Sequence, residues 1–234
     1  MTNALRLAGY LLFTWGLMAP LSLFSQDTYI AQLSGLQEVL PVFSSGYGTV
    51  TAKLDGNQLS VSGTFAGLTS DFNPNAAGGS HIHLGYAGQT GGIQLPLTPV
   101  LNADLRGGTY EAAANTFTLT DDQLTALKAR RWYVNIHTIA YPSGEIRGQM
   151  IPQADAYYLS TLLGSQEVPA VMSTGNGALS LELRGNELIV TGAFRNLQGD
   201  FNANVAGGSP LHLGMAGRNG GVTIRLDAKG DEGL

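Results

Sequence analysis

The chain has 234 residues, a formal net charge of −5 and no cysteine. Its 12 Lys and Arg residues are scattered, so no basic surface for neutralising nucleic-acid phosphates is expected. The lack of cysteine excludes a disulfide framework, a zinc ribbon, an iron–sulfur site and a cysteine nucleophile. The 32 glycines, set among Thr-, Ser- and Val-rich segments, favour many short strands joined by tight turns.

Residues 1–26 have the pattern of a secretory signal peptide. Arg6 precedes an apolar stretch over residues 7–24, and small or polar residues follow at Ser25 and Gln26. The alternative is a membrane anchor, but the stretch is shorter than the ~20 apolar residues of a clean span, and Pro20 interrupts it. We therefore expect a secreted or periplasmic protein without a stable membrane span after cleavage.

The remaining chain contains an internal repeat. "DFNPNAAGGSHIHLGYAGQTGG" matches "DFNANVAGGSPLHLGMAGRNGG", and all matched positions lie 129 apart without a gap, as in Gln37 and Gln166. This spacing predicts a first repeat over residues 27–152, a linker over 153–157 and a second repeat over 158–234. The second repeat ends at the position equivalent to residue 105, so we expect it to be truncated, with unpaired strand edges.

The segments of the first repeat predict an antiparallel all-β fold. Strands are expected at 29–34, 48–54, 58–65 and 80–84, with a turn at Gly56 and a glycine-rich loop over 85–92. Residues 110–114 and 116–118 predict a further hairpin. A short helix should begin after Thr120, where Gln123 completes a capping box, and a closing hairpin should follow over 132–151. This order of elements favours a Greek-key sandwich or barrel.

Three histidines of the first repeat are candidate metal ligands. Side chains alternate along a strand, so His81 and His83 should share one face while Ile82 points into the core. If the strand that carries His137 pairs nearby, the three imidazoles converge and suit copper or, less well, zinc. The alternative is that each histidine is an ordinary strand residue with a hydrogen-bond partner.

The second repeat bears on this choice, because it keeps only one of these histidines. Pro210 stands at the position of His81, whereas His212 stands at that of His83. A three-histidine site therefore belongs to the first repeat alone, and the strand itself does not need His81.

Arg147 is a second candidate, in the closing hairpin. It alternates with Glu145 and Gln149 on one face, and an ion pair with Glu145 or a neighbouring strand is the simplest expectation. The alternative is a cation that guides an anion toward a metal.

The stretches "SHIHLGYAGQTGG" and "WYVNIHTIAYPSGEIRGQM" resemble the CHRD domain, the module repeated in chordin and common in exported bacterial proteins. The resemblance covers the first repeat and the second as far as its glycine loop. It implies an immunoglobulin-like barrel with distant similarity to Cu/Zn superoxide dismutases, which hold copper with an H-x-H pair and further histidines. A fourth copper histidine, a zinc site and a disulfide are not visible in this chain.

Three functions follow as hypotheses. The first is an extracytoplasmic binding or structural module whose partner is an unknown protein or surface component. The second is a copper-binding protein that uses His81, His83 and His137. The third is a copper-only dismutase-like enzyme in which Arg147 attracts the anion. We favour the non-enzymatic module, with the metal site as a feature of its first repeat.

Overall fold

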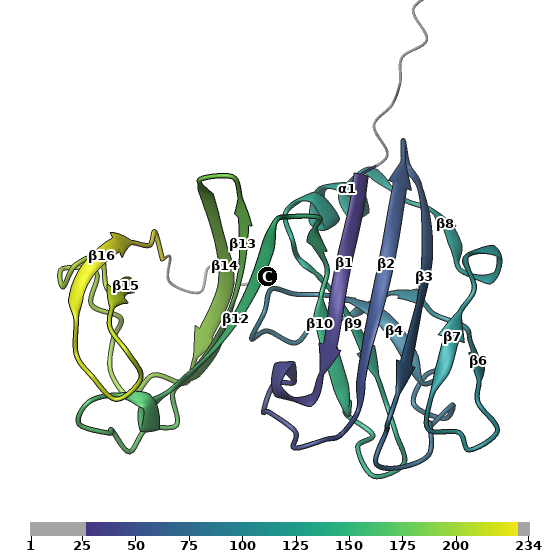
Figure 1. Ribbon diagram of the computed structural model, residues 1–234, viewed down its shortest axis with the longest axis horizontal. Coiled ribbons are helices and arrows are strands. Elements are labelled where there is room, and N and C mark those ends of the chain that lie inside the picture. Colours follow the sequence, from purple (N-terminus) through teal and green to yellow (C-terminus); the bar gives the residue numbers. More distant parts are fainter. Residues whose placement is uncertain (1–26, 229–234) are drawn as a thin grey trace, which may run out of the picture.

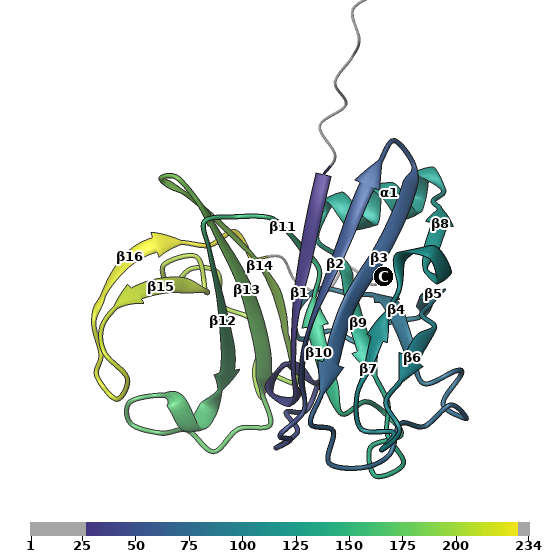
Figure 2. The same ribbon diagram turned by 45° about the vertical axis from the view of Figure 1, so that its right-hand side comes forward.

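The computed structural model describes residues 27–228 as two all-β units that lie side by side (Figures 1 and 2). The predicted signal peptide, residues 1–26, lies outside the described residues. Within residues 27–228, no helix has both the length and the apolar composition needed to cross a bilayer.

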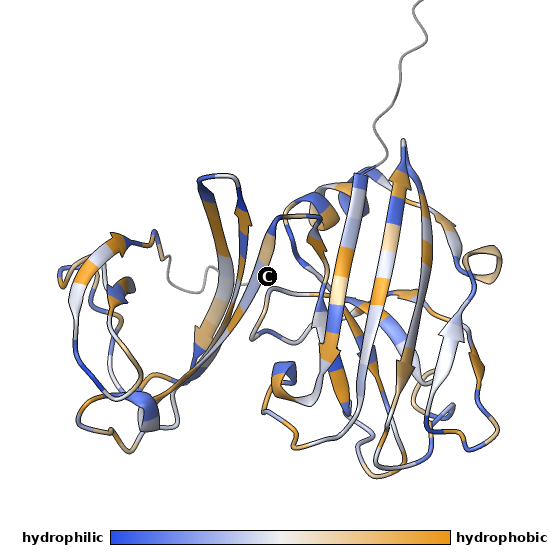
Figure 3. Ribbon diagram, in the orientation of Figure 1, coloured by the Kyte–Doolittle hydropathy of each residue, from blue (hydrophilic) through white to orange (hydrophobic). Residues whose placement is uncertain are grey.

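The first repeat forms one curled antiparallel sheet. Its strands are β1 (Asp27–Ser34), β2 (Tyr47–Asp55), β3 (Gln58–Ala66), β4 (Ser80–Leu84), β5 (Ile93–Pro96), β6 (Pro99–Leu101), β7 (Gly108–Tyr110), β8 (Thr116–Thr118), β9 (Trp132–Ile136), β10 (Ile146–Gln149) and β11 (Ile151–Pro152). They pair in the order β5-β4-β9-β10-β1-β2-β3-β7-β6, while β11 pairs with β1 and β8 with β3. The strands alternate hydrophobic and hydrophilic residues, as the bands along β1 and β2 show (Figure 3). The sheet thus encloses its hydrophobic side, which confirms the predicted all-β class.

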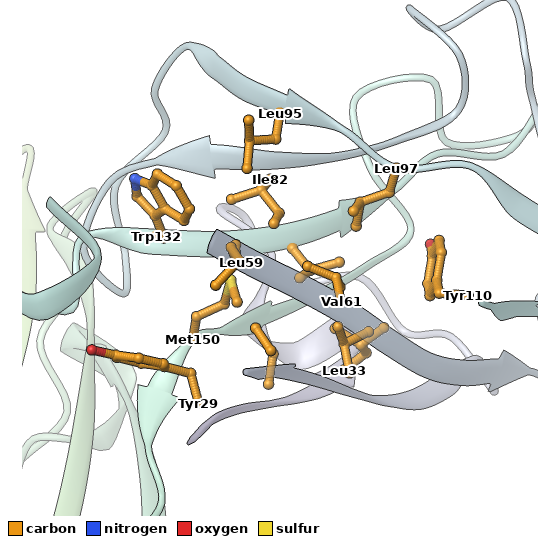
Figure 4. Packing of buried hydrophobic residues seen from close by; sticks show 14 of the residues in the cluster. Tyr29, Leu33, Leu59, Val61, Ile82, Leu95, Leu97, Tyr110, Trp132 and Met150 are labelled. Carbon is orange, nitrogen blue, oxygen red and sulfur yellow. The ribbon is translucent and has the colours of Figure 1, made fainter. Parts of the chain in front are cut away.

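The core lies on the concave side of this sheet. Trp132, Ile82 and Leu59 are fully buried there and face one another across the barrel with Met150 (Figure 4). Burial of each large apolar side chain contributes about 1.5–3 kcal/mol, so the core of the first repeat provides a rigid support for groups on its outer face.

Two local predictions have different outcomes. The helix α1 (Asp121–Lys128) has the predicted capping box, with Thr120 and Gln123 bonded to each other's backbone N–H groups. The predicted hairpin over 110–118 is wrong, because β7 and β8 both pair with β3 rather than with each other. A 3-10 turn, η2 (Ala112–Ala114), separates them, and Asn115 holds this segment by bonding to Thr98 and to the Glu111 carbonyl oxygen.

The second repeat reproduces the first five strands as two smaller sheets. They are β12 (Ala156–Leu163), β13 (Asn176–Arg184) and β14 (Glu187–Arg195), followed by the pair β15 (Pro210–Leu213) and β16 (Gly221–Arg225). Burial of equivalent positions differs: Tyr29 is 3% exposed and Tyr158 is 54% exposed. Among the described residues, nothing equivalent to β9–β11 covers Tyr158, so its ring stays accessible.

Candidate metal centre

Pairing of β4 with β9 brings the three histidines together. In the register of this pair, His81 lies opposite Asn135 and His83 lies opposite Tyr133. His137 follows Asn135 by two residues, so its side chain lies on the same face of the sheet. Its backbone N–H donates to the Gly79 carbonyl oxygen. Ile82 points to the other face and is fully buried in the core. The condition for convergence of the three imidazoles, that the His137 segment pairs next to the strand of His81 and His83, is therefore met.

The three imidazole rings form a compact group. The ring centroid of His81 lies 5.4 Å from that of His83 and 5.2 Å from that of His137, and the remaining pair is 6.2 Å apart. One ring nitrogen from each lies within 4.8 Å of the others. Two nitrogens bonded at about 2.0–2.1 Å to an ion in tetrahedral geometry lie about 3.3–3.4 Å apart. A pair at the full 4.8 Å would therefore need to close by about 1.5 Å, so the rings must turn slightly toward one another to hold an ion.

Each ring is also held by one backbone carbonyl. His81 donates from Nε2 to Ala77 O at 2.5 Å, His83 donates from Nδ1 to Gly91 O at 2.9 Å, and His137 donates from Nδ1 to Pro142 O at 3.1 Å. A carbonyl oxygen can only accept, so these bonds place the proton of each neutral ring on the bonded nitrogen. The other nitrogen of each ring, namely His81 Nδ1, His83 Nε2 and His137 Nε2, is buried without a hydrogen-bond partner. An N–H held by a carbonyl and a free lone pair on the opposite nitrogen are the arrangement of a metal-ligating histidine.

The surroundings keep two of these rings neutral. Burial lowers the pKa of His137 to about 4, and the neighbouring His81 adds to the effect. Burial also lowers the pKa of His83, with smaller contributions from His81 and Arg147. Since only neutral imidazole binds a metal, protons compete weakly for these two rings near neutral pH. The group fits a metal that prefers nitrogen ligands.

Arg147 lies beside this group but does not point its guanidinium at it. Nη1 donates to Gln89 O at 2.6 Å and Nη2 to Tyr86 O at 2.9 Å, while Cζ lies 3.4 Å from the ring centroid of Tyr133. The ring of Tyr133 also stacks on His83, with centroids 5.0 Å apart. Arg147, which is 1% exposed, therefore holds the glycine-rich loop over residues 85–92 against the sheet.

The expected ion pair between Arg147 and Glu145 is wrong. Glu145 instead accepts hydrogen bonds from the Ser44 hydroxyl, from the backbone and hydroxyl of Thr69, and from the Thr138 hydroxyl. Burial raises the pKa of Glu145, but these hydrogen bonds outweigh it and hold the pKa below its usual value. This fully buried carboxylate links the segment before β2, through Ser44, and the segment after β3, through Thr69, to the closing hairpin. It thereby supports the segment that carries His137.

Glu38 is a buried polar residue that the sequence did not single out. Burial raises its pKa to about 7, while the charge of Arg147 acts in the opposite direction. Glu38 Oε1 and Asn135 Oδ1 are buried and both lack hydrogen-bond partners. Both oxygens lie close to Gly144, because a Cβ added to that glycine would stand 2.6 Å from each of them. The only sequence signal was that Glu38 recurs in the second repeat, as Glu167.

The second repeat preserves one part of the site. His212 Nδ1 donates to Gly220 O at 2.8 Å, which matches the bond from His83 to Gly91. His212 is exposed, however, and Pro210 replaces the first histidine. In the described part of the chain, the group of three potential ligands occurs in the first repeat alone. The carbonyl bond of His83 therefore belongs to the repeated fold, whereas the convergence of three rings does not.

The family model of the CHRD domain matches residues 29–150 and again residues 158–234. No curated protein and no solved structure matches the chain. The two matches coincide with the two repeats and cover most of the sequence, so the chain belongs to the CHRD domain family.

Proposed function

We propose that the protein is an exported CHRD binding module whose first repeat holds one copper ion through His81, His83 and His137. The observation that carries the proposal is the set of three buried ring nitrogens without partners, each on a ring whose other nitrogen donates to a backbone carbonyl. Leaving a buried polar atom unpaired costs about 1–3 kcal/mol, so three such atoms in one group need a reason. A bound metal supplies that reason.

Copper fits the ligand set better than other ions do. The group offers three imidazoles and neither thiolate nor carboxylate. Imidazole ligands suit copper and zinc, and at a given site copper(II) binds more tightly than the other divalent first-row metals. Three imidazoles would leave one position of a four-coordinate ion for a water or an anion, and His83 is only partly buried.

Holding the metal is favoured over a dismutase-like reaction by the placement of Arg147. Guidance of an anion needs a cation whose charge reaches the substrate path. The guanidinium of Arg147 is buried, bonded to two carbonyl oxygens and stacked on Tyr133. These contacts support a structural role for Arg147. We further propose that the partner of the module is a protein or surface component outside the cytoplasm.

Metal content after loading with copper, and separately with zinc, tests the proposal. Wild type, His83→Ala and His212→Ala are compared, because the two histidines occupy equivalent positions and make equivalent carbonyl bonds. We expect about one copper per chain, with nitrogen coupling in the electron paramagnetic resonance spectrum, for wild type and His212→Ala, and loss of both in His83→Ala. Wild type without stoichiometric metal, or equal binding by all three proteins, would refute the three-histidine site.

A further inference from the structure

We infer that the second repeat positions the metal site of the first repeat, by docking on the loop that orients His83. The loop comprises residues 85–92, between β4 and β5, and is called the glycine loop below. This inference rests on the proposed copper site. It assigns to the second repeat, which has only one of the three histidines, the role of supporting the metal site of the first repeat.

The glycine loop makes several contacts to the residues around the metal site. Gly91 O accepts the Nδ1 proton of His83, and Gly91 N donates to the Tyr133 hydroxyl at 3.2 Å. Gln89 O and Tyr86 O accept from Arg147, which stacks on the same tyrosine ring. A shift of this loop would therefore move the carbonyl that sets the orientation and tautomer of His83.

The second repeat lies directly against the tip of this loop. A Cβ added at Gly88 would stand 2.7 Å from Ala178 N on β13 and 2.7 Å from Ala193 O on β14. Ala87 and Gly88 are buried, although they form the tip of a loop. The two backbones approach so closely that only glycine fits, which marks a tight and specific contact.

An ion pair joins the repeats beside this contact. Glu182 on β13 accepts from Nε of Arg130 at 2.9 Å and also from Nη2, and it is only 2% exposed. The carbonyl oxygen of Arg130 accepts from Gln149 Nε2 at 2.7 Å, and the same nitrogen donates to Gly85 O at 2.9 Å. The ion pair is thus linked through one amide to the start of the glycine loop.

The sequences of the two repeats differ at this surface. Ala178, Ser180 and Glu182 alternate along the outward face of β13, where Ser180 and Glu182 are buried and Glu182 pairs with Arg130 of the first repeat. The equivalent residues on β2 are Thr49, Thr51 and Lys53, and Lys53 is exposed. Replacement of an exposed lysine by a buried glutamate gives Arg130 a partner. The outward face of β13 has therefore become an interface, while that of β2 faces solvent.

Docking in this way prepares the site for metal. A loop already ordered by the second repeat has less freedom to lose when His83 binds an ion, so affinity rises and release slows. Partners that orient ligating histidines typically change metal affinity by about 10–100-fold. We expect the contact at Gly88 to contribute an effect in this range.

Two matched pairs of variants test the inference. Gly88→Ala and Gly217→Ala are equivalent by the 129-residue spacing and have φ of +82° and +78°, but a Cβ at Gly217 meets nothing within 4 Å. Glu182→Gln weakens the anchor from the second repeat without touching the glycine loop, and Glu187→Gln, at the exposed first residue of β14, is its control. Copper affinity is measured by chelator competition, and amide hydrogen exchange of Gly91 is measured in the metal-free protein.

We expect copper affinity to fall about 10–100-fold in Gly88→Ala and by a smaller factor in Glu182→Gln, with faster exchange at Gly91 in both. Both controls should match wild type. Tight copper binding with unchanged exchange in both test variants would overturn the inference and leave the copper site intact. An effect in Gly88→Ala without one in Glu182→Gln would also overturn it, because the loop geometry alone would then be responsible. Failure of wild type to bind copper would refute the proposed function itself.

Discussion

Replacement of Arg147 by methionine should destabilise the first repeat by about 3 kcal/mol. The guanidinium donates to Gln89 O and Tyr86 O and lies over the ring of Tyr133. Methionine keeps the apolar stem of the side chain and loses all three interactions. The two carbonyl oxygens of the glycine loop then lie next to a group that cannot donate to them.

The expected magnitude follows from opposing contributions. Two hydrogen bonds from a charged donor contribute about 1.5–3 kcal/mol each. The cation–π contact contributes about 2 kcal/mol when the pair is shielded from water. Burial opposes them, since it lowers the pKa of Arg147 to about 10, a cost of about 3 kcal/mol for keeping the charge. The remainder is about 2–5 kcal/mol, and we expect a loss near the middle of that range.

Urea unfolding followed by the fluorescence of the buried Trp132 measures this loss. Arg147→Lys should recover only part of the stability, because a lysine cannot bond to both carbonyl oxygens in the same fork geometry. Arg106→Met is the control, since Arg106 is exposed and its ion pair with Asp71 should contribute less than about 1 kcal/mol. A loss below about 1 kcal/mol in Arg147→Met, or one equal to that in the control, would refute the reasoning.

Four further effects are expected. Glu145→Gln should lower the free energy of unfolding in urea by about 2–3 kcal/mol, because the Ser44 and Thr138 hydroxyls and the Thr69 backbone N–H lose a charged acceptor. Burial raises the pKa of Glu38 to about 7, so wild-type stability should fall as pH rises from about 4.5 to 7; Glu38→Gln should lack this fall, which reaches at most about 3 kcal/mol. Thr120→Ala should cost about 1 kcal/mol through loss of the helix cap. Copper at a hundredfold excess over its Kd should stabilise wild type and His212→Ala by about 2.7 kcal/mol in calorimetry, and His83→Ala far less.

Each expectation has a contrary result. Unchanged stability of Glu145→Gln would mean that a neutral amide serves the Ser44 and Thr138 hydroxyls as well as the carboxylate does. Parallel pH profiles for wild type and Glu38→Gln would show that Glu38 titrates at an ordinary pKa. An unchanged free energy of unfolding in Thr120→Ala would show that the capping box does not stabilise α1. Equal copper stabilisation of His83→Ala and His212→Ala would indicate binding elsewhere on the surface.

The sequence by itself determined the features that depend on neighbouring residues and on spacing. The 129-residue offset defined the two repeats, and the family matches follow them. The capping box at Thr120 and Gln123 depends on residues three apart, so it was readable before any tertiary contact was known. The shared face of His81 and His83 follows from strand alternation alone.

Only the tertiary structure decided which distant groups meet. His137 joins the pair because β9 lies beside β4, and the register of that pairing depends on the core side chains on the opposite face. The partner of Arg147 was mispredicted because a strand pattern indicates a face and not what covers it; the glycine loop folds over that face and supplies carbonyl oxygens. The hairpin at 110–118 failed for a similar reason, since β3 offered a longer paired edge than the two short strands offered each other.

The contact between the repeats was also beyond the sequence pattern. Gly88 and Gly217 look alike in their loops, and both have positive φ. Only the position of β13 and β14 makes one of them a point of close backbone approach and leaves the other open. Local propensity acts over a few residues, whereas the packing of two sheets depends on the shape of whole surfaces, and this is why the candidate site became complete only in the folded chain.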